Sequence, residues 1–230
     1  MALPVLNDTP KYELKIPSTG KKIKFRPYLV KEEKVLMMAA ESGDGVQMMG
    51  AIMDTIQSCV QSQTKVENLT TFDIEYLFIK LRSKSVGESS TINLSCESCK
   101  EPNEHVIDLE SIECVGDTKD KLIKISDEVT VEMKYPSYKD INLNQDENEM
   151  GFDILANSMS AVLTEEDRIE MSDETPENIR EFLESMTKEQ FEKVSTFLLD
   201  MPQVKHKIVY DCVKCHEPNE IELKGIQSFF

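Results

Sequence analysis

The fold is decided by two nearly identical stretches, CESCKEPNE at residues 96–104 and CVKCHEPNE at residues 212–220. Each is a Cys-x-x-Cys pair followed, after one variable residue, by Glu-Pro-Asn-Glu. Strand-like runs flank both stretches, at residues 91–94 and 105–109 around the first and at 207–210 and 221–223 around the second. A strand, a Cys-x-x-Cys turn and a second strand form one half of a tetrahedral thiolate zinc site. Two such halves would make a complete site.

Zinc prefers four ligands, so one cysteine pair cannot complete its coordination shell. The pairs are separated by the 112 residues between Cys99 and Cys212, which is far beyond ordinary zinc-finger spacing. The chain must therefore leave the first hairpin, build other structure and return. We expect one structural Zn²⁺ per chain, without an open coordination position for water or substrate, bound by Cys96, Cys99, Cys212 and Cys215.

Other interpretations of the cysteine pairs stay open. They could form disulfides, occupy two separate intermolecular sites, or act as redox motifs. A reducing cytoplasm disfavours disulfides, and neither pair is followed by the strand-to-helix pattern of redox motifs. His216 could replace a thiolate in principle, but with four thiolates present we expect it to be an outer neighbour. Cys59 and Cys114 are expected to be ordinary cysteines.

Composition indicates a soluble, globular protein that does not bind nucleic acid or membranes. The chain has 230 residues, of which 40% are hydrophobic and 30% charged. Its net charge of −17 disfavours nucleic-acid binding, which requires clustered basic residues. No apolar run approaches the roughly 18 residues of a membrane span. The first residues lack a basic start and a long apolar stretch, so we expect no secretory signal and a cytoplasmic protein.

The charge is unevenly distributed along the chain. Residues 11–26 contain six basic side chains and one acidic one, whereas residues 140–190 contain fifteen acidic and three basic ones. The acidic region is either a solvated face or a surface for a partner with basic residues.

The N-terminal third predicts a β-hairpin followed by helices. Residues 12–16 and 22–26 alternate apolar and polar side chains around a turn, giving one apolar and one basic face. Apolar residues at helical spacing predict three helices, over residues 30–41, 46–63 and 70–85. Thr70 and Asp73 have the spacing of a capping box. Core packing is the simpler interpretation of the many methionines here, and an adaptable binding groove is the alternative.

The second half predicts another hairpin and a series of short helices. In order, the expected elements are a loop over 111–119, a hairpin over 121–133, an exposed acidic loop over 142–149, a helix over 152–163, an acidic helix or turn over 164–167, and helices over 175–186 and 187–199. Thr175–Pro176 caps the first of the last two helices, and Thr187 with Gln190 caps the second. The apolar end, Phe229 and Phe230, either packs on the body or inserts into a neighbouring molecule.

These elements predict an α+β fold in which helical regions and short antiparallel hairpins accompany a composite zinc ribbon built from two distant Cys-x-x-Cys knuckles. The expected domains are an N-terminal hairpin with three helices over 1–87, the ribbon over 88–110 and 204–226, an inserted hairpin and acidic helical region over 111–203, and an apolar tail over 227–230.

No motif indicates catalysis. The sequence contains no phosphate loop, no Gly-x-Ser-x-Gly elbow and no His-Glu-x-x-His. The three histidines, His105, His206 and His216, all lie near the expected ribbon, and no carboxylates form a recognisable acid–base pair. We therefore expect a non-enzymatic protein that acts through protein contacts.

The N-terminal third contains Leu3-Pro4, Tyr12-Glu13-Leu14, a PSTGK run at 17–21 and a FRPYLVKEEK run at 25–34. With these runs it resembles the T-even-type bacteriophage baseplate family, whose members are called baseplate hub subunits. The paired Cys-x-x-Cys units with Pro-Asn and the short apolar tail fit the same family. The resemblance implies work in tail morphogenesis, as a hub component or an assembly chaperone. Either form acts in the host cytoplasm during assembly, and a retained hub component would also be found in the virion tail baseplate. It brings no catalytic residues.

The implied partners are other baseplate and tail proteins, and an oligomeric state within the assembly is compatible with this role. The surfaces expected to bind partners are the basic N-terminal hairpin, the acidic region at 140–190 and the Phe229-Phe230 tail. The alternative function is a zinc-ribbon adaptor of a transcription or nucleic-acid-processing complex. The charge of −17 and the lack of clustered basic residues around the knuckles disfavour this alternative.

Overall fold

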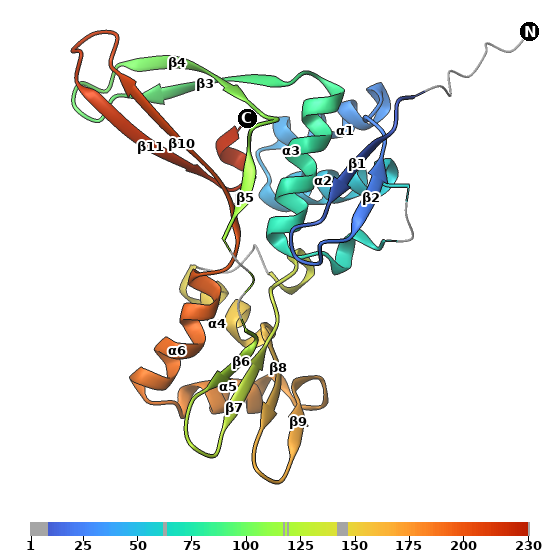
Figure 1. Ribbon diagram of the computed structural model, residues 1–230, viewed down its shortest axis with the longest axis vertical. Helices are drawn as coiled ribbons and strands as arrows, with labels where there is room; N and C mark the ends of the chain where they lie inside the picture. The colour runs from blue at the N-terminus through green and yellow to red at the C-terminus, as the bar shows by residue number, and fades with distance from the viewer. Residues whose placement is uncertain (1–8, 62–63, 117, 119, 142–146, 230) are drawn as a thin grey trace, which may run out of the picture. The chain divides into compact units, whose positions relative to one another are not determined.

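The computed structural model describes residues 9–61, 64–116, 118, 120–141 and 147–229 (Figure 1). It divides into two compact units. The first unit combines Met1–Val115 with Gln203–Phe230, whereas the second is the continuous segment Gly116–Pro202. Both units mix helices with antiparallel sheets, which confirms the expected mixture of helices and antiparallel hairpins.

The first unit begins with the predicted hairpin. Strand β1 (Tyr12–Lys15) pairs antiparallel with β2 (Lys22–Phe25). Ile23 and Phe25 are buried beneath the hairpin, while the lysines of β2 are exposed on its other face. The alternating pattern therefore produces one apolar and one basic face, as the sequence predicts.

The three predicted helices follow the hairpin, as α1 (Val30–Ser42), α2 (Gly45–Cys59) and α3 (Thr71–Ser85). The helix predicted over 46–63 is wrong at residues 60–61, because Val60 bridges to Phe25 of β2, and residues 62–63 lie outside the described residues. A short 3-10 turn, η1 (Val66–Asn68), precedes α3. The predicted capping box forms, because Thr70 accepts from the N–H of Asp73 and Asp73 accepts from the N–H of Thr70. Asp73 also accepts from the N–H of Ser18 at 2.9 Å, which ties the hairpin turn to α3.

Two further hairpins carry the cysteines. Strand β3 (Ser89–Ser95) pairs with β4 (Pro102–Asp108), and β10 (Gln203–Asp211) pairs with β11 (Pro218–Lys224). The short strand β5 (Glu113–Val115) pairs with the other edge of β10. The predicted loop over 111–119 is therefore wrong at β5, whose partner lies about ninety residues further along the chain and leaves no local signal.

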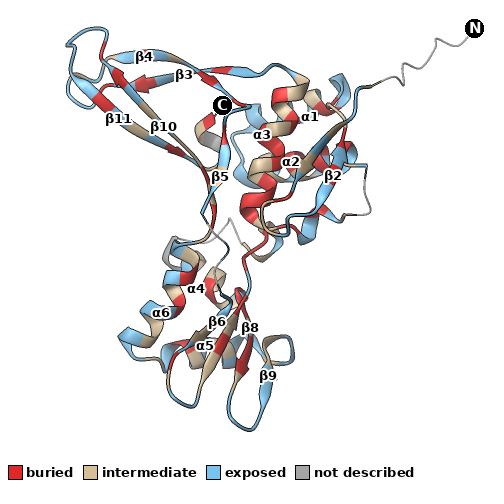
Figure 2. Cartoon of the chain, in the orientation of Figure 1, coloured by how far each residue is buried: buried red, intermediate tan, exposed pale blue. Residues whose placement is uncertain are grey.

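A buried cluster joins these hairpins to α3 and the C-terminus. Figure 2 shows the buried residues along α3 in red. The cluster is formed by Ile79, Ile92, Leu94, Ile107, Leu109, Ile112, Val204, Tyr210, Leu223 and Phe229. Phe229, in the turn η4 (Ile226–Phe229), is fully buried, so the alternative in which it packs on the body is confirmed and it does not form part of a partner-binding surface. Phe230 lies outside the described residues.

The second unit contains a four-stranded antiparallel sheet in the order β6-β7-β8-β9. The strands are β6 (Leu122–Lys124), β7 (Thr130–Met133), β8 (Met159–Leu163) and β9 (Arg168–Glu170). The predicted hairpin is β6–β7. The helical elements are η2 (Tyr138–Asp140), α4 (Glu147–Asn157), η3 (Met171–Asp173), α5 (Pro176–Glu184) and α6 (Lys188–Leu199).

The helix predicted over 152–163 is wrong in its second half. The helix is α4, and it ends at Asn157; the next segment is the strand β8. Met159 and Ala161 are buried in the pairing of β8 with β7, because a short apolar run fits either a buried strand or a helix and tertiary pairing decides. The predicted exposed loop over 142–149 is wrong from Glu147 onward, where α4 begins, and its residues 142–146 lie outside the described residues.

The predicted turn and helix caps of the second unit agree with the structure. The acidic stretch at 164–167 is the turn between β8 and β9, where the N–H of Asp167 donates to Thr164 Oγ1 at 3.0 Å. Thr175 caps α5, which has Pro176 in its first turn, and Thr187 caps α6. Across the described part of the chain, no helix has the length and apolar character needed to span a bilayer.

Candidate metal centre

The same backbone turn forms at both cysteine knuckles. In the first, the N–H of Cys96 donates to the carbonyl of Glu101 at 2.9 Å, and the N–H of Lys100 donates to the carbonyl of Cys96 at 3.0 Å. The second knuckle repeats both bonds at 3.0 Å, between Cys212, Glu217 and His216. The repeated sequence therefore specifies a repeated local structure.

The residue after the second cysteine of each knuckle adopts a left-handed conformation. Lys100 has φ 60° and His216 has φ 59°, and within the described residues these are the two non-glycine positions with positive φ. This conformation is uncommon for residues with a side chain, and it closes each turn. The side chain of His216 is exposed, and the cluster of metal-ligating groups described next does not include it.

The fold brings all four predicted cysteines together across the two hairpins. Their sulfur atoms lie within 4.8 Å of one another. The Sγ atoms of Cys96 and Cys215 are 3.7 Å apart, and those of Cys99 and Cys212 are 3.6 Å apart. Sulfurs bound at about 2.3 Å to a tetrahedral zinc ion lie about 3.8 Å from one another. The cluster therefore has the size of a four-thiolate metal site.

The same distances exclude disulfides in this structure. A disulfide joins its sulfurs at about 2.05 Å, and all four cysteines are free thiols. Cys96 and Cys212, the first cysteine of each knuckle, are fully buried, whereas Cys99 is half-buried and Cys215 is exposed. The site is thus closed on the side of the hairpins and open to solvent at the outer edge of the second knuckle.

Asn103 connects the first hairpin to the second knuckle. Its side-chain oxygen accepts from the backbone N–H of Val213 at 2.8 Å, and its amide nitrogen donates to the carbonyl of Glu101 at 2.7 Å. Only 2% of Asn103 is exposed. A buried amide that joins both knuckles fixes the distance between them.

Asn219 makes the same connection in the opposite direction. Its oxygen accepts from the N–H of Glu97 at 2.9 Å, and its nitrogen donates to the carbonyl of Glu217 at 2.8 Å. The two asparagines form a reciprocal pair of latches between the knuckles. Sequence reasoning assigned them no role, although their identical position after each cysteine pair was the available signal.

The thiols cannot all ionise independently. The backbone N–H of Cys99 lowers the pKa of Cys96, and the N–H of Cys215 lowers the pKa of Cys212 to about 6. The N–H of Glu217 also favours ionisation of Cys215, but the nearby thiols, Cys99 first, raise its pKa to about 12. Four thiolates at this spacing repel one another, so a bound cation is what would allow all four to ionise.

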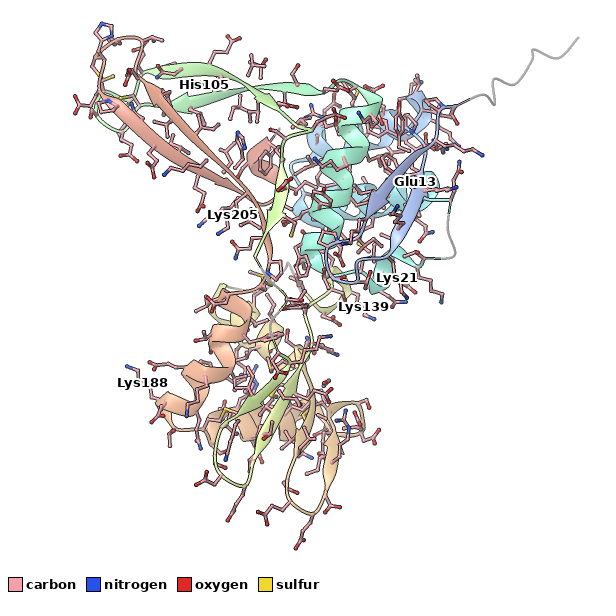
Figure 3. The ribbon with its side chains drawn as sticks, viewed as in Figure 1. Glu13, Lys21, His105, Lys139, Lys188 and Lys205 are labelled. Carbon is pink, nitrogen blue, oxygen red and sulfur yellow. The ribbon has the colours of Figure 1, made fainter. Side chains whose placement is uncertain are left out.

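The other candidate ligands lie outside the cluster. His105 on β4 packs against Tyr210 on β10 with ring centroids 4.3 Å apart, and Figure 3 shows it on the ribbon. Cys59 is buried at the end of α2, where burial raises its pKa to about 11, and burial raises the pKa of Cys114 on β5 to about 12. Among the described residues, neither thiol belongs to a group that could hold a metal.

Comparison with known proteins assigns the chain to a family. A family model described as T4 bacteriophage base plate protein matches residues 9–230. No curated protein and no solved structure matches the chain. The match covers both units, including the two knuckles and the segment between them. Such a family implies a structural rather than a catalytic role in the phage tail. The chain is a member of the T4 bacteriophage base plate protein family.

Proposed function

We propose that the protein is a structural or assembly component of the baseplate hub and that one zinc ion, bound by Cys96, Cys99, Cys212 and Cys215, stabilises its first unit. The observation that carries the zinc proposal is the approach of four sulfurs from two distant segments to within 4.8 Å. Thiolates are soft ligands, and a tetrahedral site of four sulfurs is typical of zinc. When bound, the ion would supply charge neutralisation and a cross-link.

In this proposal the zinc ion has a structural role, as a cross-link between the two hairpins. Four protein ligands fill its coordination shell, which leaves no position for a substrate or an activated water. The two hairpins it joins end in the buried cluster that contains α3 and Phe229. The metal would thereby hold the C-terminal segment against the N-terminal helices and keep the first unit in one shape for its partners.

The partners are other baseplate and tail proteins, and the protein acts through contacts with them. This follows from the family and from the lack of a catalytic motif in the sequence. The role has two forms, a component retained in the hub and a chaperone that leaves after assembly in the host cytoplasm. Proteomics of purified phage particles separates them, since a retained component is found in the particles and a chaperone is found only in infected cells.

The hub assignment is tested by capturing tagged protein from infected cells. We expect baseplate hub proteins to copurify with it, and the knuckle variant Cys212→Ser to recover less of them. Recovery of RNA polymerase or other nucleic-acid machinery in place of tail proteins would contradict the proposal and favour an adaptor role. Recovery of outer baseplate proteins without hub proteins would keep the family assignment and reject the hub role.

A further inference from the structure

Most of the negative charge of the protein belongs to the second unit. Gly116–Pro202 contains 22 acidic and nine basic side chains, a net charge of −13 out of −17 for the whole chain. Such a surface repels nucleic acid and anionic lipid, and it attracts segments that carry lysine and arginine.

A groove with an apolar lining lies beside α5 within this acidic unit. We call it the α5 groove; its main hollow has a volume of about 270 Å³ and lies between β8, β9 and α5. The apolar residues that line the hollow are Val162, Ile169, Met171, Ile179 and Phe182. Ile169 is 41% exposed on β9, the edge strand of the sheet. A large apolar side chain from a partner would bury this surface.

A second hollow adjoins the first near the start of α5, where Arg180 stacks over Phe152. Its volume is about 430 Å³, and it shares Glu174 and Ile179 with the first. Phe152 and Glu177 also line it. Each of the two adjoining hollows has room for one side chain of a partner segment.

Acidic side chains lie in and beside the α5 groove: Glu174 and Glu177 line its hollows, and Glu165, Glu166 and Asp167 line a separate hollow. Residues 165–184 contain nine acidic and two basic side chains. Both basic side chains already form ion pairs: Arg168 with Glu132 and Glu170, and Arg180 with Asp153 at 3.2 Å. Within the described structure, the eight acidic residues of this segment other than Glu170 have no cationic partner. The rim thus carries a negative charge that the second unit does not neutralise.

The basic hairpin of a second copy of this chain fits the α5 groove less well. It would supply lysines, but its apolar residues Ile23 and Phe25 are 3% and 2% exposed and cannot enter the hollow. The groove requires an exposed apolar side chain and positive charge on the same segment.

We propose that the α5 groove binds a basic amphipathic segment of another baseplate protein. A large apolar side chain of the segment enters the hollow between β9 and α5, and flanking lysines or arginines contact the carboxylates of the rim. The inference rests on the proposed function only in naming the partner as a baseplate protein; the chemistry of the segment follows from the groove itself.

Fluorescence anisotropy of the full-length protein tests the proposal. The probe is a labelled peptide of about twelve residues with leucines at helical spacing and lysines elsewhere. Two control peptides replace its leucines with serine or its lysines with glutamate. We expect the leucine–lysine probe to bind, and each control to bind at least about tenfold more weakly, at physiological salt. Equal binding of the serine control would overturn the proposal, because charge alone would then explain it.

Matched variants locate the binding surface. Glu177→Lys with Glu181→Lys, on α5, is expected to weaken binding of the probe about tenfold or more, whereas Glu189→Lys with Glu192→Lys, on α6, changes the net charge equally and is expected to have a much smaller effect. Ile169→Ser is expected to weaken binding, and Leu199→Ser, which alters an exposed leucine of α6, is the control. Equal effects of groove and control variants would overturn the proposal.

Sedimentation velocity excludes the alternative occupant. Salt-sensitive self-association that Lys15→Glu with Lys22→Glu abolishes, without binding of the probe, would assign the α5 groove to a second copy and overturn the proposal. Probe binding in the groove with no recovery of tail proteins from infected cells would instead contradict the proposed function and leave the groove assignment intact.

Discussion

The two units of this protein are formed from the chain in different ways: the first from two separate segments and the second from one continuous segment. The first joins Met1–Val115 to Gln203–Phe230 across a long intervening segment, whereas the second closes within the continuous stretch Gly116–Pro202. The first unit has a cluster of four thiols, two reciprocal asparagine latches and a core that includes its own C-terminal residues. The second has short antiparallel pairings and side-chain helix caps.

This difference shows where a metal has most effect. Bringing distant segments together costs conformational entropy that grows slowly with loop length, and a cross-link between them lowers that cost in the unfolded chain. The knuckles are located where the two segments of the first unit meet. The second unit makes its contacts within one continuous segment, with strand pairings at most 33 residues apart, as between Thr130 and Leu163, and a Tyr135–Phe197 ring contact 62 residues apart. Its closure therefore spans less of the chain than the 113 positions from Cys99 to Cys212.

The largest expected effect is that of metal removal. A strong chelator should destabilise the first unit by about 5 kcal/mol or more, since structural zinc in small domains contributes about 10–16 kcal/mol and this unit also has an apolar core. The second unit should keep its stability. Hydrogen exchange, measured with and without the chelator, gives the amide protection of each unit separately. Equal loss of protection in both units would show that they do not differ in this way.

Truncation of the C-terminal core residue comes next. Phe229→Ala removes a fully buried side chain from the first unit and should lower its free energy of unfolding by about 3–5 kcal/mol. Thermal or denaturant unfolding gives the value. Val115→Ala is a suitable control in the same unit, because Val115 is 51% exposed. A loss below about 1 kcal/mol for Phe229→Ala would mean that the C-terminal turn is not part of the core.

The asparagine latches should tune metal affinity. Asn103→Ala and Asn219→Ala each remove a bond between the knuckles, and each should lower zinc affinity about 10- to 100-fold, as is usual for groups that orient metal ligands. Competition with a chromophoric chelator measures this. Asn93→Ala, on the exposed face of β3, is the control. If all three variants bound zinc with similar affinity, Asn103 and Asn219 would have no role in orienting the metal ligands.

The smallest effect is expected in the second unit. Thr187→Ala removes the cap of α6 and should cost that unit about 1 kcal/mol without changing zinc content. Unfolding curves and metal analysis of the same sample check both parts. Loss of zinc in this variant would show that the second unit controls the metal centre, contrary to the comparison.

Local chemistry in the sequence predicts most elements and the grouping of the cysteines. The Thr70–Asp73 and Thr187–Gln190 capping boxes begin α3 and α6, and turn residues separate β1 from β2. The two cysteine pairs are predicted to lie close together, because zinc requires four ligands and each knuckle offers two.

Features that depend on distant partners were not predictable in this way. Strand β5 exists because β10 lies beside it, and β8 replaces the expected end of a helix because it pairs with β7. The latches escape prediction for the same reason, since the N–H groups that Asn103 and Asn219 bond belong to the opposite knuckle. Periodicity within a segment carries no information about a neighbour encoded elsewhere.

The metal proposal requires that two distant segments share one ion. Elemental analysis of the purified protein and of the variants Cys96→Ser and Cys212→Ser tests this sharing, with Cys59→Ser as the control for a buried cysteine outside the site. We predict one zinc per chain in the native protein and the control, and almost none in either knuckle variant. Retention of a full equivalent of zinc in Cys96→Ser or Cys212→Ser, or two equivalents in the native protein, would contradict it.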